Sequence, residues 1–176
     1  TGFTIRLKAP DTTGTYTFAV RMVRDGVEWF GPTFSKTITV VDGYRKMINV
    51  GGNSLTDEKG YHWLADQPYT SGSWGYTGSS TVLSTTSSIT VADKYNRYGS
   101  SQYKTLRKGT MFGYRFDNVP NGTYKVTLFF ADHESTSSSQ NLINVDIEGY
   151  EAIKALDVYK NRCGRFKAMI AEDIFV

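Results

Sequence analysis

The β character of this chain is plainest in FGYRFDNVPNGTYKVTLFF, residues 112–130. The first five residues and the last seven are rich in aromatic and β-branched side chains, which favour strands. Residues 119–123 lie between them and contain a proline and an Asn-Gly pair, which is typical of a tight hairpin turn. Alternation along the second strand predicts four inward-facing side chains, Tyr124, Val126, Leu128 and Phe130.

The composition extends this prediction to the whole chain. Aromatic residues make up 14% of the 176 residues, with 12 tyrosines, and Thr, Ser and Gly are abundant, so we expect an all-β, antiparallel fold. The net charge is +3, from 20 basic and 17 acidic residues, and no long basic run occurs. This charge pattern argues against nucleic acid as a partner, and the lack of an apolar run near 18 residues argues against membrane insertion.

The chain divides into two blocks in the sequence. Strands are expected at residues 3–7, 15–23 and 29–41, which would form a meander too small to be stable alone. Asp42-Gly43 is the expected boundary, so the predicted domains are residues 1–42 and 43–176. Because the first and last strands begin and end in mid-pattern, we expect a segment of a longer protein whose second domain lacks its last strands.

The second block shows weaker signals between its strands. Residues 47–50 predict a short strand, and residues 57–60 a turn of a small hairpin. The Ser/Thr-rich residues 79–90 have weak β character, and a mobile insertion is an alternative interpretation of them. Residues 97–107 are compatible with a helical turn. Further strands are expected at residues 142–147, 166–170 and 174–176.

An aromatic loop at residues 67–78 is the first candidate for a binding site. Its Gly, Pro, Ser and Thr residues disfavour a helix and surround Trp74 and Tyr76. A sugar presents an apolar face of C–H groups and a rim of hydroxyls, so exposed rings beside short polar side chains suit it. Equally, Trp74 and Tyr76 could fold back and cover the end of a β-sandwich.

The second block resembles the malectin-like family of carbohydrate-binding β-sandwich domains. The resemblance rests on the following segments in family order: INVGG (48–52), WLAD (63–66), SWGY (73–76), YKTLR (103–107), FGYRF (112–116), VPNGTY (119–124), FFAD (129–132) and NVDIEG (144–149). It implies a jelly-roll-like antiparallel sandwich.

The same resemblance implies which residues contact the sugar. Tyr76 and Tyr103 would be the ring platforms, with Asp66 and Asp132 as polar or supporting groups, and Trp74 of the aromatic loop completes the candidate set. The family's lectin has an aromatic pair after the acidic residue that corresponds to Asp132, where this chain has His133-Glu134-Ser135.

The first block resembles the C-terminal half of an Ig-like domain with conserved tryptophans, found in bacterial cell-surface enzymes. The segments that carry this resemblance are APDTTGTYTF (9–18), RMV (21–23) and GVEWFG (26–31). It implies a spacer or interaction module in which Trp29 packs.

Catalysis and metal binding have little support. In a strand, Asp132 and Glu134 would point to one side and His133 to the other, which is poor geometry for a three-ligand metal site. The single cysteine, Cys163, has arginines nearby but no local histidine, and it excludes an internal disulfide. We therefore expect no enzyme activity, no metal and no cofactor.

Two hypotheses follow from the sequence. The first is a non-catalytic carbohydrate-binding module of a larger secreted or cell-surface bacterial protein, binding glucan-type oligosaccharides or polysaccharides by aromatic stacking. The alternative is a structural subunit of an extracellular assembly or filament, self-associating through open strand edges.

Overall fold

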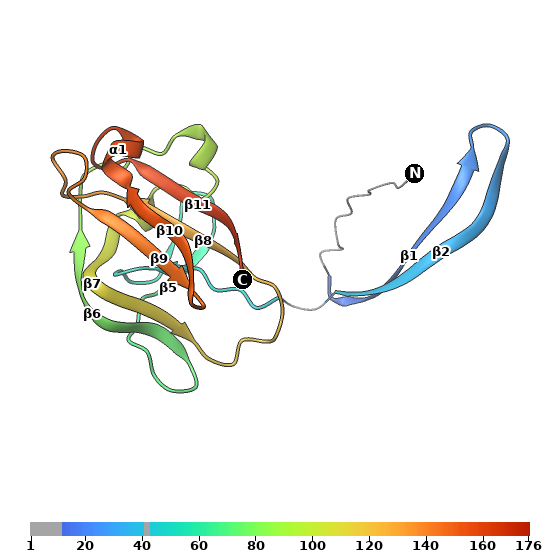
Figure 1. Ribbon diagram of the computed structural model, residues 1–176, viewed down its shortest axis with the longest axis horizontal. Helices are drawn as coiled ribbons and strands as arrows, with labels where there is room; N and C mark the ends of the chain where they lie inside the picture. The colour runs from blue at the N-terminus through green and yellow to red at the C-terminus, as the bar shows by residue number, and fades with distance from the viewer. Residues whose placement is uncertain (1–11, 41–42) are drawn as a thin grey trace. The chain divides into compact units, whose positions relative to one another are not determined.

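The computed structural model describes residues 12–40 and 43–176 and is almost entirely β (Figure 1). It divides into an N-terminal unit, Thr1–Arg45, and a C-terminal unit, Lys46–Val176. The expected strand at residues 3–7 and the expected boundary at Asp42 lie outside the described residues. The all-β, antiparallel prediction is confirmed.

The N-terminal unit contains one antiparallel ribbon of two strands, β1 (Gly14–Arg24) and β2 (Glu28–Val40). The alternating sequence gives this ribbon one apolar face, because residues opposite each other in the register lie on the same face. That face carries the pairs Tyr16 and Ile38, and Val20 and Phe34. Phe34 is 59% exposed, so the described part of this unit leaves much of its apolar face uncovered.

The C-terminal unit is built from strand pairs. Its elements are β3 (Ile48–Asn49), β4 (Leu55–Thr56), β5 (His62–Ala65), β6 (Trp74–Ser84), η1 (Asp93–Tyr95), η2 (Ser101–Tyr103), β7 (Thr105–Phe116), β8 (Lys125–Ala131), β9 (Leu142–Ile147), β10 (Tyr150–Asp157), α1 (Val158–Arg162) and β11 (Ala168–Phe175). Antiparallel pairs join β6 to β7, β8 to β11, β9 to β10 and β4 to β5, while β3 pairs with β5 in parallel. Figure 1 shows the long β6–β7 ribbon along one side of this unit.

Residues 112–130 form two strands as expected, but the segment between them is not a hairpin turn. β7 pairs with β6, and β8 pairs with β11, so residues 117–124 connect two different strand pairs. Phe129 also differs from the predicted alternation, because its ring packs edge-on against Trp63 with centroids 5.0 Å apart. β8 is half-buried along both faces, which a period-two pattern does not anticipate.

Long-range strand pairing determines the structure of the segments whose sequence signals were weak. Residues 79–84 continue β6, since they pair with β7 as far as Ser84 and Thr105. Residues 97–107 hold the short 3-10 helix η2, and β7 begins one residue after it, at Thr105. The two expected C-terminal strands are one strand, β11, with an irregularity between Ala171 and Ile174.

The core of the C-terminal unit is small and aromatic. Its buried cluster consists of Ile89, Tyr103, Ala168 and Ile170. Trp63 is 2% exposed nearby, and its indole N–H donates to the Asp57 carboxylate at 2.9 Å, which satisfies the polar atom of a buried ring.

The structure contains a short helix, α1, at residues where no helix is predicted from the sequence. Asp157 caps its start by accepting a hydrogen bond from the Lys160 N–H at 2.8 Å, and Cys163 ends it with a left-handed backbone, φ 54°. The capping aspartate was the available sequence signal. Across the described ranges, no helix is long and apolar enough to cross a membrane.

Candidate functional site

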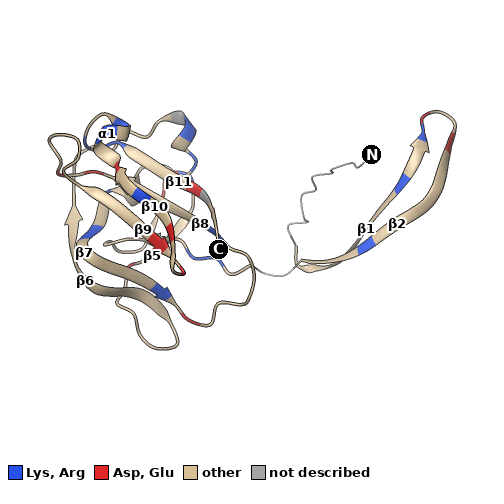
Figure 2. Cartoon of the chain, in the orientation of Figure 1, with Lys and Arg blue, Asp and Glu red and all other residues tan. Residues whose placement is uncertain are grey.

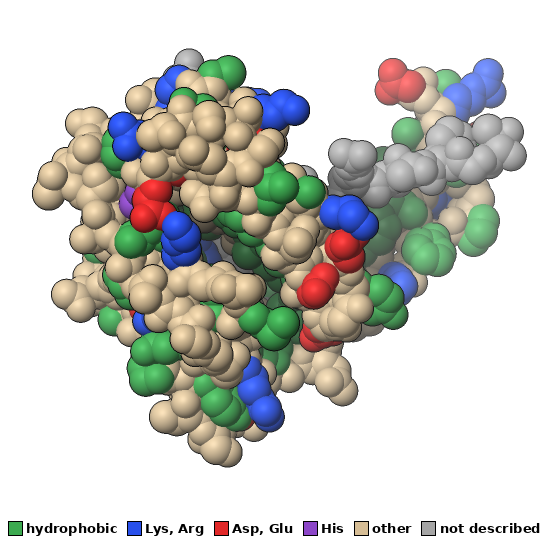
Figure 3. All heavy atoms as spheres, turned by 60° about the vertical axis from the view of Figure 1, so that its left-hand side comes forward, with side chains coloured by type: hydrophobic (Ala, Val, Ile, Leu, Met, Phe, Trp, Pro, Cys, Tyr) green, Lys and Arg blue, Asp and Glu red, His purple; other side chains and the backbone are tan. Residues whose placement is uncertain are grey.

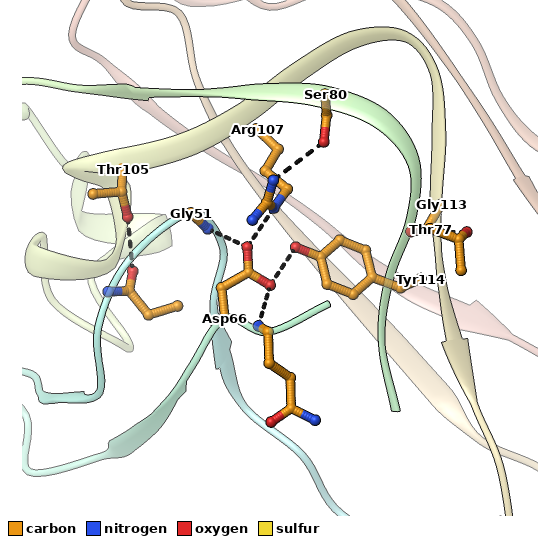
Figure 4. A network of polar contacts seen from close by, with 10 residues as sticks. Gly51, Asp66, Thr77, Ser80, Thr105, Arg107, Gly113 and Tyr114 are labelled. Carbon is orange, nitrogen blue, oxygen red and sulfur yellow. Dashed lines mark hydrogen bonds and ion pairs between the residues drawn. The ribbon is translucent and has the colours of Figure 1, made fainter. Parts of the chain in front are cut away.

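Asp66, just after β5, is the centre of a buried polar network (Figure 4). Its Oδ2 accepts hydrogen bonds from the Gly51 N–H at 2.7 Å and from Arg107 Nε at 2.5 Å. Its Oδ1 accepts from the Tyr114 hydroxyl at 2.9 Å and from the Gln67 N–H at 3.0 Å. The Asp66 side chain is only 3% exposed, so these four donors replace the water that a carboxylate would otherwise bind.

Arg107 on β7 connects this carboxylate to an aromatic ring. Its guanidinium carbon lies 3.3 Å from the centroid of the Tyr76 ring, and its Nη1 donates to the Ser80 hydroxyl at 3.2 Å. Burial disfavours the charged form of Arg107, but the hydrogen bond and charge of Asp66 outweigh burial and raise the pKa of Arg107. Arg107 therefore stays charged between a carboxylate and the face of a tyrosine.

Tyr76 and Tyr114 lie opposite each other on β6 and β7. Directly opposed residues of an antiparallel pair share one face of the sheet, so both rings belong to the face that carries Asp66 and Arg107. Both tyrosines are half-buried. Burial, together with the hydrogen bond to Asp66, raises the pKa of Tyr114, which keeps its hydroxyl protonated as a donor.

The start of the aromatic loop is fixed on β6 by close backbone contact. Tyr76 N–H donates to the Gln67 carbonyl, and Tyr69 N–H donates to the Tyr76 carbonyl, each at 2.9 Å. Gly75 makes this approach possible, because a Cβ there would lie 2.5 Å from the carbonyl carbon of Pro68.

Asp117 holds the tip of the same loop. Its carboxylate accepts from the Tyr69 hydroxyl at 2.6 Å, the Gly72 N–H at 2.9 Å and Arg115 Nε at 2.9 Å. The Tyr69 hydrogen bond is the largest of the effects that lower the pKa of Asp117, followed by that of Arg115. The loop is thus a shaped structure tied to the end of β7.

Trp74 packs against Phe116 of β7 instead of standing out from the aromatic loop. It is 8% exposed and stacks on Phe116, with ring centroids 6.2 Å apart and planes at 9°. The Lys46 ammonium lies 5.2 Å from the Trp74 ring centroid. Phe116, the other ring of the stacked pair, is 39% exposed and reaches the surface. The sequence could not predict this pair, because it depends on the register of β7 with β6.

Tyr103 lies in the core, which differs from the ring platform expected of it. It is 2% exposed, and its ring packs edge-on against Phe129 at 5.8 Å. Burial raises the pKa of its hydroxyl, which has no hydrogen-bond partner among the described residues. With its faces enclosed, the Tyr103 ring is not available to a ligand in this structure.

Asp132 organises the loop after β8. Its Oδ1 accepts from the backbone N–H groups of Glu134 at 2.9 Å and Ser135 at 2.8 Å, and its Oδ2 from the Ser135 hydroxyl at 2.5 Å. Burial alone would raise the pKa of Asp132, but these hydrogen bonds outweigh it and lower the pKa. Asp132 is therefore an ionised, buried group that supports a loop.

Asp132, His133 and Glu134 lie after the end of β8, so strand alternation does not apply to them, and their side chains contact different parts of the chain. His133 Nε2 lies 2.9 Å from the Tyr103 carbonyl oxygen, and burial lowers the pKa of this imidazole. Glu134 forms an ion pair with Lys108 on β7. Within residues 12–40 and 43–176, no three His, Cys, Asp or Glu side chains gather as metal ligands would.

Fold and site together define a β-sandwich domain that carries paired tyrosines beside a buried carboxylate and arginine. The family model of the malectin domain matches residues 45–176, and the chain therefore belongs to the malectin domain family. The preceding Ig-like resemblance stays a prediction.

A solved structure shares this fold. The crystal structure of Bacteroides uniformis beta-glucuronidase aligns with 97% of this chain at 22% sequence identity and a TM-score of 0.60. This chain corresponds to 20% of the length of that protein. A search of curated proteins found no match.

Proposed function

We propose that the C-terminal unit is a non-catalytic carbohydrate-binding module of a larger secreted or cell-surface protein. Membership of the malectin domain family supports a carbohydrate ligand. The structural similarity to a segment of a much longer glycosidase supports a module within a larger chain. The finer points of the proposal, glucan-type ligands and a bacterial, extracellular setting, rest on the sequence resemblance.

The observation that carries the proposal is the tyrosine pair on β6 and β7 beside Asp66 and Arg107. Tyr76 and Tyr114 share a face, and Tyr76 is held from one side by the Arg107 guanidinium. An oriented ring loses little entropy when a sugar stacks on it. We assign Tyr76 as the ring that contacts the sugar, while Asp66 and Arg107 act as positioning residues because their side chains are 3% and 9% exposed.

The other predicted contacts have supporting roles in this proposal. Trp74 and Tyr103 are core rings, and Asp132 shapes the loop that begins at His133. A non-catalytic role is supported by the state of the carboxylates. The Asp66 side chain is 3% exposed and accepts four hydrogen bonds, so it cannot reach a glycosidic oxygen. The lowered pKa of Asp132 does not suit the protonated acid that glycoside hydrolysis requires.

The test is isothermal titration of the 176-residue chain against a panel of neutral gluco-oligosaccharides, with galacto-oligosaccharides as the comparison. We expect Kd values on the order of micromolar to millimolar for the gluco series, since few rings stack and sugar hydroxyls exchange water for protein partners with little net gain. Absence of heat across the whole gluco series at millimolar ligand contradicts the proposal.

A second candidate function is favoured by the β1–β2 ribbon. One face of this ribbon exposes Phe34 at 59%, Met22 at 51% and Phe30, the residue opposite Met22, at 46%. Contiguous apolar surface of this kind marks an interaction site, which supports a structural role in an extracellular assembly. Light scattering distinguishes the two: concentration-dependent association that Phe34→Ser abolishes supports assembly, and a monomer at high concentration contradicts it.

A further inference from the structure

Two segments that are far apart in the sequence lie side by side at one end of the C-terminal unit. Thr90 N–H donates to the Phe166 carbonyl at 2.8 Å, and Ala168 N–H donates to the Thr90 carbonyl at 2.9 Å. Basic residues follow the first segment in the sequence and precede the second. The basic patch formed in this way consists of Lys94, Arg97, Arg162 and Arg165. Their cationic groups lie over Tyr95, Tyr98 and Phe166, three rings packed against the same buried cluster.

The figures show basic residues at this end of the C-terminal unit. Figure 2 shows several Lys and Arg positions around α1 and the loop beside it. Figure 3 shows basic side chains over the same end of the C-terminal unit. The sequence showed no long basic run, and it is the pairing of two distant segments that creates the patch.

Aromatic rings hold the cations of the basic patch in place. Lys94 Nζ lies 4.7 Å and the Arg162 guanidinium carbon 5.0 Å from the centroid of the same Tyr95 ring. Arg97 lies 5.2 Å from the Tyr98 centroid. Two cations that share one ring repel each other, and a bound anion relieves this repulsion.

Described acidic groups near the basic patch are already engaged. The Asp157 carboxylate accepts the Ser139 N–H at 2.6 Å and the Lys160 N–H at 2.8 Å. In the part of the chain that the structure describes, none of Lys94, Arg97, Arg162 and Arg165 forms an ion pair. Glu172 on β11 forms an ion pair with Lys125, and the sequence adds two acidic residues, Asp93 in η1 and Asp173 in β11.

Arg162 provides an independent indication of a missing partner. Its Nε is buried and has no hydrogen-bond acceptor among the described residues. A buried donor without an acceptor is rare and unfavourable, and an acceptor supplied by a ligand would satisfy it.

We propose that the basic patch is a second glycan site, separate from the Asp66 network, that binds a polysaccharide bearing carboxylate or sulfate groups. Guanidinium and ammonium groups in fixed positions recognise such anions by charge-assisted hydrogen bonds. Single-stranded nucleic acid is the less suitable partner, because the Tyr95 and Tyr98 faces are occupied by cations and offer no platform for base stacking.

The test measures binding of the 176-residue chain to dextran sulfate, polygalacturonate and uncharged dextran by biolayer interferometry at two salt concentrations. One variant neutralises exposed residues of the patch: Lys94→Gln, Arg97→Gln and Arg165→Gln. The control removes the same charge elsewhere in the C-terminal unit: Lys59→Gln, Lys125→Gln and Lys154→Gln.

We expect both charged polymers to bind more tightly than dextran, with affinity falling as salt rises. The patch variant should lose about tenfold in affinity and the control variant less than twofold. A preference between dextran sulfate and polygalacturonate identifies the recognised group as sulfate or carboxylate.

Three results overturn this proposal. They are an equal loss in both variants, equal affinity for charged and uncharged dextran, and equal or tighter binding of a single-stranded oligonucleotide. Binding of neutral gluco-oligosaccharides should be the same in the patch variant and the unchanged chain, so the two sites fail or succeed independently.

Discussion

The guanidinium of Arg107 contacts both the Asp66 carboxylate and the ring of Tyr76. Arg107 Nε lies 2.5 Å from Asp66 Oδ2, and the guanidinium carbon lies 3.3 Å from the centroid of the Tyr76 ring. This arrangement joins the end of β5 to β6 and β7 through side chains. It fixes the ring assigned to sugar stacking by means of a buried charge pair.

Replacing Arg107 by alanine should therefore destabilise the domain strongly. The Asp66 side chain is 3% exposed, so the variant leaves a buried carboxylate without its counter-ion, a loss of about 3 kcal/mol in the free energy of unfolding. Urea denaturation measures this loss. Adding Asp66→Asn to Arg107→Ala should restore part of it, because the unpaired charge is removed.

The matched control for this prediction is Lys108→Ala, which breaks an ion pair whose lysine side chain is 50% exposed. Its loss should stay below about 1 kcal/mol. Similar losses for Arg107→Ala and Lys108→Ala would show that burial of the Asp66 pair has no energetic consequence.

Glu58 should make stability depend on pH in the acidic range. Burial favours its neutral form, but hydrogen bonds from Ser100 and Ser101 outweigh burial and lower the pKa of Glu58 from 4.5 to about 2. A lowered folded-state pKa means that this stabilisation is complete above pH 4.5 and is lost as the pH falls toward 2.

Thermal melts of the unchanged chain and of Glu58→Gln between pH 2 and pH 6 test this dependence. The variant should melt lower near pH 6, and the difference should shrink as the pH falls. A difference that is constant with pH would contradict the assigned role of the Glu58 carboxylate.

Gly75→Ala should disrupt the aromatic loop. The added Cβ would lie 2.5 Å from backbone atoms of Pro68 and Tyr69, so the loop must move away from β6, with a loss of about 2 kcal/mol or more. Gly113→Ala in the partner strand is the control, since its nearest contact is an ordinary 3.6 Å to Thr77. Equal melting temperatures for the two variants would be inconsistent with close packing at Gly75.

Tyr103→Phe should leave the domain as stable as before or increase the free energy of unfolding by about 1 kcal/mol, because it removes a buried hydroxyl that lacks a described partner. Saccharide affinity should not change, since the ring is 2% exposed. Chemical denaturation and sugar titration of the same preparation measure both quantities. A clear loss of sugar affinity would return Tyr103 to the binding site.

Local sequence patterns were sufficient for much of the fold. Aromatic and β-branched runs located β8 and the second part of β7, residues 112–116, and the turn at residues 57–60 joins β4 and β5 as expected. These features depend on neighbouring residues only. The pairing of β7 with β6, and the connection at residues 117–124 in place of a hairpin, depend on partners far away in the chain.

The sequence predicted some residues of the candidate site but not how they are arranged in space. Asp66 and Tyr76 lie in one network, but the residue that joins them, Arg107, is 41 positions from Asp66 and was not singled out. Tyr103 and Trp74 are buried because of strand pairing and core packing, which no local pattern of exposure reveals. Aromatic residues suit a core and a sugar site equally, so the sequence alone could not separate these roles.

The most direct test of the central claim is isothermal titration of gluco-oligosaccharides into the unchanged chain, Tyr76→Ala and Tyr150→Ala. Tyr150 is 80% exposed, so it serves as the control for loss of a surface tyrosine. The account predicts that Tyr76→Ala loses at least about tenfold in affinity, the loss expected for one stacked ring, while Tyr150→Ala binds like the unchanged chain. Undiminished binding by a folded Tyr76→Ala protein would contradict it.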